Sequence, residues 1–399
     1  MKKLFPSRKK RTSNQKPKKR SPAELKVLLE KYREVVRLNP QDGMGHYNLG
    51  EVYMELFRFS EAVPPLKEAI RINPKNRSAY YQLGTALVEL GRDDDSLEYL
   101  EETLRLDPKS MVVKRRLAQA HTNLSILYGK RKQQKESMHH FKEAIKILPH
   151  YGPAHLSLGI FFTEAGRYHD ALAKIKEALS LDKNLAVDAH FNFGIVYGKL
   201  GEYQKAIKHY REAIKVSPKA ALPNLNLGML YIKVGKRAEA IQPLRTAIRM
   251  SPNLAREAHF KLGAILLKLK RYPEAVEPLK EAVKITPNNE KVRDYLAEAL
   301  YHAAASLENS NPPTKAVEVL KEAIEYNPEH VLAHFRLGQA YDKAGQGYYA
   351  IVHTTIAKKS FVEQGNEEWL AKSVRALRAF FKKYPYKPED FAKVRVPRK

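Results

Sequence analysis

The sequence contains no cysteine, which excludes structural disulfides, thiolate catalysis and cysteine-ligated metal sites. It also contains no apolar run of about 18 residues, the length that predicts a membrane-spanning helix. The first residues have the positive charge of a signal peptide, but only Leu4 and Phe5 precede a proline and more charge, so no apolar segment follows. These absences predict a soluble protein of the reducing cytoplasm with no transmembrane segment.

Acidic residues are scarce: 44 Asp and Glu stand against 71 Lys and Arg, a net charge of +27. Residues 1–22 contain basic residues with no acidic residue between them, so this basic tail should be disordered. Its candidate polyanion contacts are Arg8, Lys9, Lys10, Arg11, Lys18, Lys19 and Arg20. The tail has three interpretations: a solubilising end, a contact for nucleic acid (RNA or DNA) or an anionic surface, and, in a eukaryote, a nuclear import signal.

One stretch, residues 189–218, recurs along the chain in close copies. If Val187 is position 1 of a 34-residue unit, positions 4, 7, 8 and 11 lie within about 100° of one helix face. A second stripe follows a glycine at positions 20, 24 and 27, and a proline at position 32 ends the unit. The residues at these positions are His190, Phe193, Gly194, Tyr197, Ala206, Tyr210, Ala213 and Pro218. The unit is therefore predicted to be a helical hairpin.

The same period runs through most of the chain. Position 8 is glycine in seven copies, at Gly50, Gly84, Gly159, Gly194, Gly228, Gly263 and Gly338. This pattern resembles the tetratricopeptide repeat (TPR) family over about Gly43 to Ala357. The resemblance implies an all-α fold, a right-handed superhelical α-solenoid of about nine hairpins, in which the first helix of each repeat lines a concave groove.

The resulting domain prediction is a disordered basic tail at 1–22, an N-terminal half-repeat or cap at 23–42 and the TPR array at 43–363. A C-terminal capping helix follows at 364–384 and a second basic tail at 385–399. The apolar side of the helix expected at 367–384 would cover the last repeat, although a membrane-surface helix has a similar composition.

The third and eighth repeats are seven residues longer than the others. The extra residues lengthen the first helices, predicted at 111–129 and 290–307, so that two hairpin tips project. The first tip carries Lys130, Arg131 and Lys132. These tips are interpreted either as harmless extensions or as docking sites.

Catalytic and metal-binding patterns are not found. Histidines recur at position 4, but on separate helices whose axes lie about 8–10 Å apart, too far for shared coordination of zinc at about 2 Å. They are interpreted as packing residues, so neither a metal nor a cofactor is expected. With no nucleotide-binding loop or nucleophile motif, an enzyme is not expected either.

Positions 2, 6, 9 and 13 of each first helix face away from the packing stripe and should line the groove. Position 6 is rich in amides, which can pair with the backbone of an extended peptide. The residues in this row are Asn48, Gln82, Ser157, Asn192, Asn226, Lys261 and Arg336, and Asn123 joins them if the third repeat is read from its later register. Asparagine ladders are known in TPR proteins such as the O-linked N-acetylglucosamine transferases, but a habitual asparagine of the repeat is an equal interpretation.

An apolar floor accompanies the amides, formed by Phe191, Ile195, Leu225, Met229 and Phe260. Position 13 changes from glutamate in the first repeats to lysine in the later ones. The leading hypothesis is a non-enzymatic scaffold that holds an extended or helical segment of a protein partner in this groove. The alternative is an RNA- or ribosome-associated factor that uses its basic residues. A chaperone adaptor is disfavoured, because no position 5 carries the lysine of the carboxylate clamp. Nothing in the sequence indicates an oligomeric state.

Overall fold

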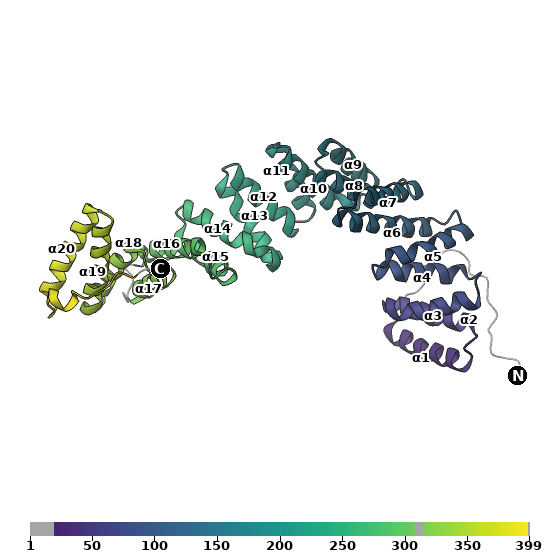
Figure 1. Ribbon diagram of the computed structural model, residues 1–399, viewed down its shortest axis with the longest axis horizontal. Helices are drawn as coiled ribbons and strands as arrows, with labels where there is room; N and C mark the ends of the chain where they lie inside the picture. Colours follow the sequence, from purple (N-terminus) through teal and green to yellow (C-terminus); the bar gives the residue numbers. More distant parts are fainter. Residues whose placement is uncertain (1–19, 308–313, 398–399) are drawn as a thin grey trace. The chain divides into compact units, whose positions relative to one another are not determined.

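The computed structural model describes residues 20–307 and 314–397, and within them the chain forms twenty α-helices and no strand (Figure 1). Successive helices pair into hairpins, as the glycine and proline spacing predicts. A single helix, α1 (Pro22–Leu38), precedes the hairpins, and another, α20 (Glu367–Lys383), follows them.

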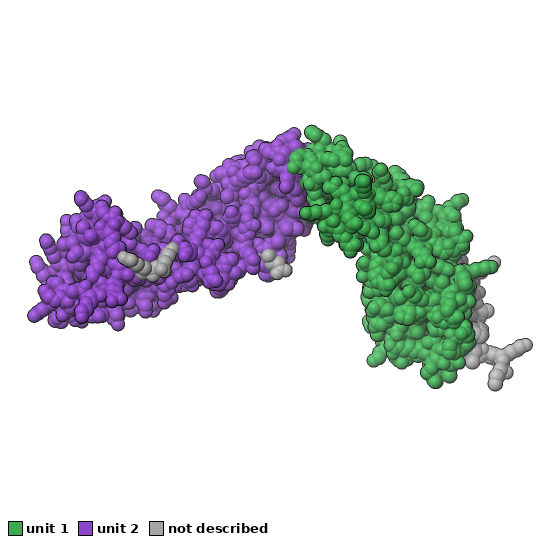
Figure 2. Space-filling model, viewed as in Figure 1, with its two compact units in different colours: residues 1–189 green, residues 190–399 purple. Residues whose placement is uncertain are grey.

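The chain divides into two compact units, Met1–Ala189 and His190–Lys399 (Figure 2). The division falls inside α10 (Ala186–Lys199), although the sequence predicted one continuous array. The helices between α1 and α10 are α2 (Gly43–Glu55), α3 (Phe59–Ile72), α4 (Arg77–Glu89), α5 (Asp93–Leu106), α6 (Met111–Lys130), α7 (Gln134–Ile147), α8 (Gly152–Glu164) and α9 (Tyr168–Leu181).

The second unit continues the same alternation of first and second helices after α10. These helices are α11 (Tyr203–Val216), α12 (Ala221–Lys233), α13 (Arg237–Met250), α14 (Ala255–Lys268), α15 (Tyr272–Ile285), α16 (Glu290–Ala305), α17 (Thr314–Tyr326), α18 (Val331–Lys343) and α19 (Gly347–Glu363). Short 3-10 turns lie at Lys183–Leu185, Pro252–Leu254 and Pro388–Phe391. The first helices α6 and α16 are longer than most, as predicted, but the expected tip at 308–313 lies outside the described residues.

Glycine at position 8 marks the closest approach of the two helices in a hairpin. A Cβ atom on Gly84 would lie 2.6 Å from Cγ of Leu100, and one on Gly194 would overlap the ring of Tyr210. Leu100 is fully buried, and Tyr210 is 5% exposed. The small residue is therefore required by the packing of its own hairpin.

Three hairpins contain the same partly buried triad of two histidines and a tyrosine. Nδ1 of the position 4 histidine lies 2.9 Å from Nδ1 of a histidine nineteen residues later in His121–His140, and 3.0 Å away in His190–His209 and His334–His353. The second imidazole also stacks on the position 11 tyrosine, in the pairs Tyr128–His140, Tyr197–His209 and Tyr341–His353. Each triad joins the first helix of a hairpin to the second.

A second bond explains the histidine at position 4 in several repeats. Nε2 of His155 lies 2.8 Å from the carbonyl oxygen of Pro149, the proline that closes the preceding repeat. His46 and His334 make the equivalent contact with Pro40 and Pro328 at 3.1 and 3.0 Å. Because a carbonyl only accepts, Nε2 of His334 carries the proton, and its Nδ1 accepts from Nδ1–H of His353.

The ends of the described chain are tied down. Ser21 caps α1: its hydroxyl accepts from the Glu24 amide, and the Glu24 carboxylate accepts from the Ser21 amide at 2.6 Å. At the other end, Phe391 is 3% exposed, and Lys359 Nζ donates to the carbonyl of Val394 at 2.6 Å. Among the described residues, no helix combines the length and apolarity needed to cross a membrane.

Candidate functional site

A hollow of about 780 Å³ in unit 2 lies over the first helices α10, α12 and α14. Four residues predicted from the sequence line it: Ile195, Asn226, Met229 and Lys261. The structure adds Gly198, Lys199, Tyr210, Leu230, Ile232 and Lys233 to its lining. We call this surface the unit 2 hollow. Positions 6, 9, 12 and 13 of successive helices meet there because they share one helix face.

The floor of the unit 2 hollow is held by a bond between two repeats. The amide of Asn226 on α12 hydrogen-bonds the hydroxyl of Tyr210 on α11. Burial raises the pKa of Tyr210 to about 12, and the bond from Asn226 opposes this rise. The tyrosine is therefore neutral, and Asn226 already has one partner inside the protein.

Gly198 lines the hollow on α10. A Cβ atom added to Gly198 would meet no other atom within 4 Å, unlike one at Gly194 in the same helix. Glycine weakens a helix interior by roughly 0.5–1 kcal/mol relative to alanine, and no packing contact of this fold requires it here. The residue leaves open space on the surface of α10.

The position 5 residues of the predicted floor also pack against other helices, both within a hairpin and between repeats. The ring centres of Phe191 and Tyr210 lie 6.0 Å apart, and Phe260 stacks on Tyr295 with ring centres 5.4 Å apart. Leu225 is half-buried against the same core. That these residues line the groove stays a prediction, but part of each side chain packs against neighbouring helices.

The other predicted amides differ in their surroundings. Asn123 donates from Nδ2 to Oδ1 of Asp93 at 3.0 Å, and Gln82 hydrogen-bonds the hydroxyl of Tyr47. Asn192 is buried, at 9% exposure, whereas Asn48 is half-buried. Gln82 also lines a smaller hollow of about 220 Å³ in unit 1. The amides do not form one uniform open row.

The predicted basic contacts fall in two places. Arg8, Lys9, Lys10, Arg11, Lys18 and Lys19 lie outside the described residues. Arg20 forms an ion pair with Glu55 at 3.1 Å. Lys130, Arg131 and Lys132 are exposed around the end of α6.

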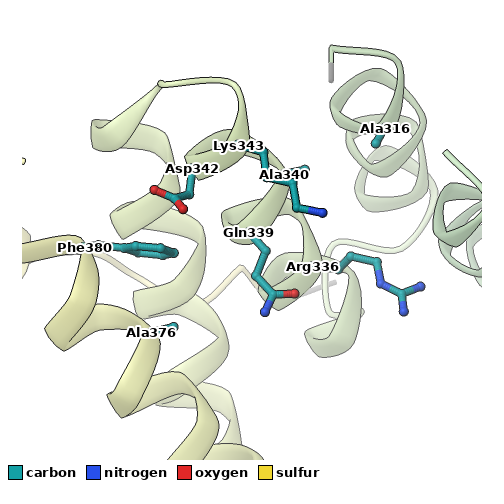
Figure 3. A pocket seen from close by; sticks show the side chains of 8 residues that line it. All are labelled: Ala316, Arg336, Gln339, Ala340, Asp342, Lys343, Ala376 and Phe380. Atoms are coloured by element: carbon teal, nitrogen blue, oxygen red, sulfur yellow. The ribbon is translucent and has the colours of Figure 1, made fainter. Parts of the chain in front are cut away.

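Arg336 belongs to a separate hollow of about 380 Å³ against the C-terminal helix (Figure 3). Its guanidinium donates to the backbone carbonyl of Tyr301 at 3.1 Å, and its Cζ lies 4.5 Å from the centre of the Tyr301 ring. Gln339 of α18 and Phe380 of α20 also line this hollow (Figure 3). The acidic residue at its rim, Asp342, is paired with Lys383 at 2.8 Å.

Some lining residues were missed as site candidates. Lys199 and Lys233 occupy position 13, where the sequence changes from glutamate to lysine, but they were not predicted as site residues. Tyr210 was predicted only as a core residue. Gly198 carries a signal in its sequence position: it is a glycine inside a predicted helix, away from position 8, where the packing of the hairpin does not require one. Among the described residues, no three His, Asp or Glu side chains lie together so that they could hold a metal ion.

Models of the tetratricopeptide repeat match residues 53–120, 187–219, 225–290 and 301–346, which together cover more than half of the chain. The chain belongs to the tetratricopeptide repeat family. A model of anaphase-promoting complex subunit 5 also matches this TPR chain, at residues 92–149 and 148–186. TPR arrays are protein-interaction scaffolds, and none of the matching models describes a catalytic domain. No curated protein matches the TPR chain as a relative.

Several solved TPR structures are similar to this TPR chain. One is pilF of Pseudomonas aeruginosa, at 19% identity and a TM-score of 0.45 over 56% of this chain and 97% of that one. Another is yeast Tom70, at 14% identity and a TM-score of 0.42 over 90% and 86%. YrrB, described as a TPR protein with an unusual peptide-binding site, has 19% identity and a TM-score of 0.36 over 49% and 96%. At these identities and scores the neighbours carry no argument about partners.

Proposed function

We propose that this TPR chain is a non-enzymatic scaffold that binds an extended or helical segment of a partner protein in the unit 2 hollow. One observation carries the proposal: four groove residues predicted from the repeat register line one open hollow of about 780 Å³. The half-buried side chains of Ile195, Met229 and Ile232 offer apolar contact there. Apolar clefts with a few fixed polar groups are typical binding sites.

The amides supply polar contacts in the same proposal. Asn226 has one bond to Tyr210, and an amide offers both donors and an acceptor, so it can still pair with a peptide backbone. Asn192, on the same helix as Ile195, is the second rung of the proposed ladder. Loss of one such hydrogen bond costs roughly 0.5–1.5 kcal/mol of binding.

Gly198 provides the direct test of the hollow. A library of 15-residue peptides would be screened with the full chain, and the selected peptides measured by fluorescence anisotropy with the wild type, Gly198→Ala and Gly198→Trp. We expect the indole of Gly198→Trp to fill the hollow and weaken binding by at least about tenfold. Gly198→Ala, the matched control, should bind as the wild type does, since its methyl group meets nothing within 4 Å. Equal binding by the tryptophan variant would exclude the hollow as the site.

A second candidate function is contact with RNA, the ribosome or another polyanion. The exposed basic residues Lys130, Arg131 and Lys132 favour it, together with the basic residues of the tail. Binding of poly(U) should then weaken steeply with added salt, because neutralised phosphates release counterions. A triple substitution of these three residues by glutamine should reduce that salt dependence. Peptide binding in an apolar hollow should change little over the same salt range.

A further inference from the structure

The lysines around the unit 2 hollow lack carboxylate partners in the part of the chain that the structure describes. Lys199 and Lys233 are exposed, Lys261 is half-buried, and no ion pair joins any of them to Asp or Glu among the described residues. The nearest feature to a partner is the ring of Tyr203, whose centre lies 4.8 Å from Nζ of Lys233. Three positive charges thus surround one concave surface without internal compensation.

Some lysines elsewhere in unit 2 do have such partners. Lys280 pairs with Glu322 at 2.8 Å, and Lys284 pairs with Glu281 at 2.5 Å. Glu257 precedes Lys261 by one helical turn on α14, yet the two form no ion pair. No Asp or Glu is among the described residues that line the hollow, so an acidic ligand would complement its lysines.

We infer that the unit 2 hollow recognises an acidic protein segment in extended conformation, with Asp or Glu recurring about every third residue around an apolar side chain. This rests on the proposed function of the same hollow. Lys199 and Lys233 hold the same position in successive repeats, and packed helices lie about 8–10 Å apart. In the extended polyproline II conformation three residues complete one turn and span about 9 Å, so acidic side chains at i and i+3 lie on one face and would reach both lysines.

The chemistry of the hollow favours a protein segment over single-stranded nucleic acid. Its apolar lining, Ile195, Met229 and Ile232, suits an aliphatic side chain. Bases bind single-strand sites by stacking on open aromatic rings. The one aromatic residue that lines the hollow, Tyr210, is 5% exposed and hydrogen-bonded to Asn226.

The test compares two fluorescein-labelled peptides of identical composition. In the first, glutamates stand at every third position around leucines; in the second, the same glutamates form one continuous run. Binding to the full chain would be measured by anisotropy at physiological ionic strength. We expect the spaced peptide to bind more tightly, because only its charges match the spacing of the lysines.

The decisive variant replaces the hollow lysines together, Lys199→Gln, Lys233→Gln and Lys261→Gln. A matched control with the same loss of charge replaces the exposed Lys215, Lys219 and Lys236, which do not line the hollow. We expect the first variant to bind the spaced peptide about tenfold more weakly, as three exposed ion pairs predict. The control should keep wild-type affinity. Circular dichroism melting would verify that both variants remain folded.

Several outcomes would overturn the inference. Equal losses in both variants would show that net charge alone attracts the peptide, and equal affinity for the clustered peptide would refute the spacing. Binding of poly(U) that is lost only in the hollow variant would make nucleic acid the partner class. A neutral leucine peptide could lose its binding in Gly198→Trp and keep its affinity for the lysine variant. That result would refute the acidic preference and leave the proposed function intact. If no selected peptide responds to Gly198→Trp, the proposed function itself fails.

Discussion

The first helices of the two units carry opposite charges at position 13, and the two sets of charges have different surroundings. In unit 1, Glu55 pairs with Arg20 at 3.1 Å and Glu89 pairs with Arg116 at 2.7 Å. In unit 2, Lys199 and Lys233 have no such partner. A row of charged residues alone therefore does not mark a binding surface. A row whose charges are already paired serves the fold, and an uncompensated row remains able to attract a ligand.

The largest expected effect tests whether the two units respond separately. Gly194→Leu in unit 2 and Gly84→Leu in unit 1 each place a side chain where the hairpin is closest, overpacking it by about 1–3 kcal/mol. Hydrogen exchange followed by mass spectrometry should show faster exchange in the unit that carries each substitution. Gly198→Leu, whose Cβ atom would meet no other atom within 4 Å, is the control. Equal loss of protection in both units would contradict the division at residue 189.

The histidine pairs should make unit 2 more sensitive to mild acid than unit 1. Burial and the neighbouring imidazole lower the pKa of His121, His209 and His353 to about 4. The neutral pairs therefore stabilise the fold fully above pH 6.5, and this stability falls as the pH drops from 6.5 toward 4. We expect a loss on the order of 1 kcal/mol per pair, allowing for solvent screening at the half-buried rings.

Unit 1 holds one of these pairs and unit 2 holds two, so hydrogen exchange at pH 7 and pH 5 should show the larger change in unit 2. Carboxylates do not obscure this window. The pKa of Glu274, for example, is lowered to about 2 by its bonds to Arg271 and Arg245, and its contribution is lost only at lower pH. An equal response of both units would show that the pairs are not the cause.

A smaller difference should separate two asparagines at the same position of the repeat. Asn226→Ala removes the bond to Tyr210 and should cost about 1 kcal/mol of unfolding free energy. Asn48→Ala in unit 1 should cost less, because the half-buried Asn48 makes no comparable bond in the described structure. Thermal unfolding measures both. Equal costs would mean that the hydroxyl of Tyr210 finds another partner when Asn226 is lost.

The smallest expected effect concerns the paired and unpaired charges themselves. Glu89→Gln breaks its pair with Arg116 and should lower stability by about 0.5 kcal/mol, as for a partly exposed ion pair. Lys199→Gln should leave stability unchanged or raise it slightly, since it relieves repulsion among the hollow lysines. Chemical denaturation of the two variants would measure this difference. A stability loss for Lys199→Gln as large as that for Glu89→Gln would reveal a hidden partner.

The sequence predicted the hairpins and their register well because both depend on local sterics. A glycine is needed where Gly194 meets Tyr210, and a closing proline follows most second helices, so residues within one repeat are enough to place them. The sequence also contains a signal for the start of α1, because Ser21 and Glu24 have the spacing of a capping box and form one in the structure. Ser21 therefore belongs to the folded part and not to the predicted disordered tail.

The partners of the groove residues could not be predicted in the same way. Asn123 bonds Asp93, thirty residues earlier, and Arg336 bonds the carbonyl of Tyr301 in another repeat. Such contacts depend on how one hairpin rests on the next, which the repeat pattern leaves unspecified. The histidine pairs, by contrast, recur at a constant spacing of nineteen residues within one hairpin. That spacing was visible in the sequence, although its meaning required the structure.

The histidine–tyrosine–histidine triads have a consequence for rearranging the chain. Each of these bonds and stacks closes within a single hairpin, from α6 to α7, α10 to α11 and α18 to α19. A hairpin that contains its own triad keeps these bonds and stacks when it is inserted elsewhere in an array. The three hairpins are thus natural cassettes for building longer or shorter chimaeric arrays, in which only the surfaces shared with neighbours would need to be redesigned.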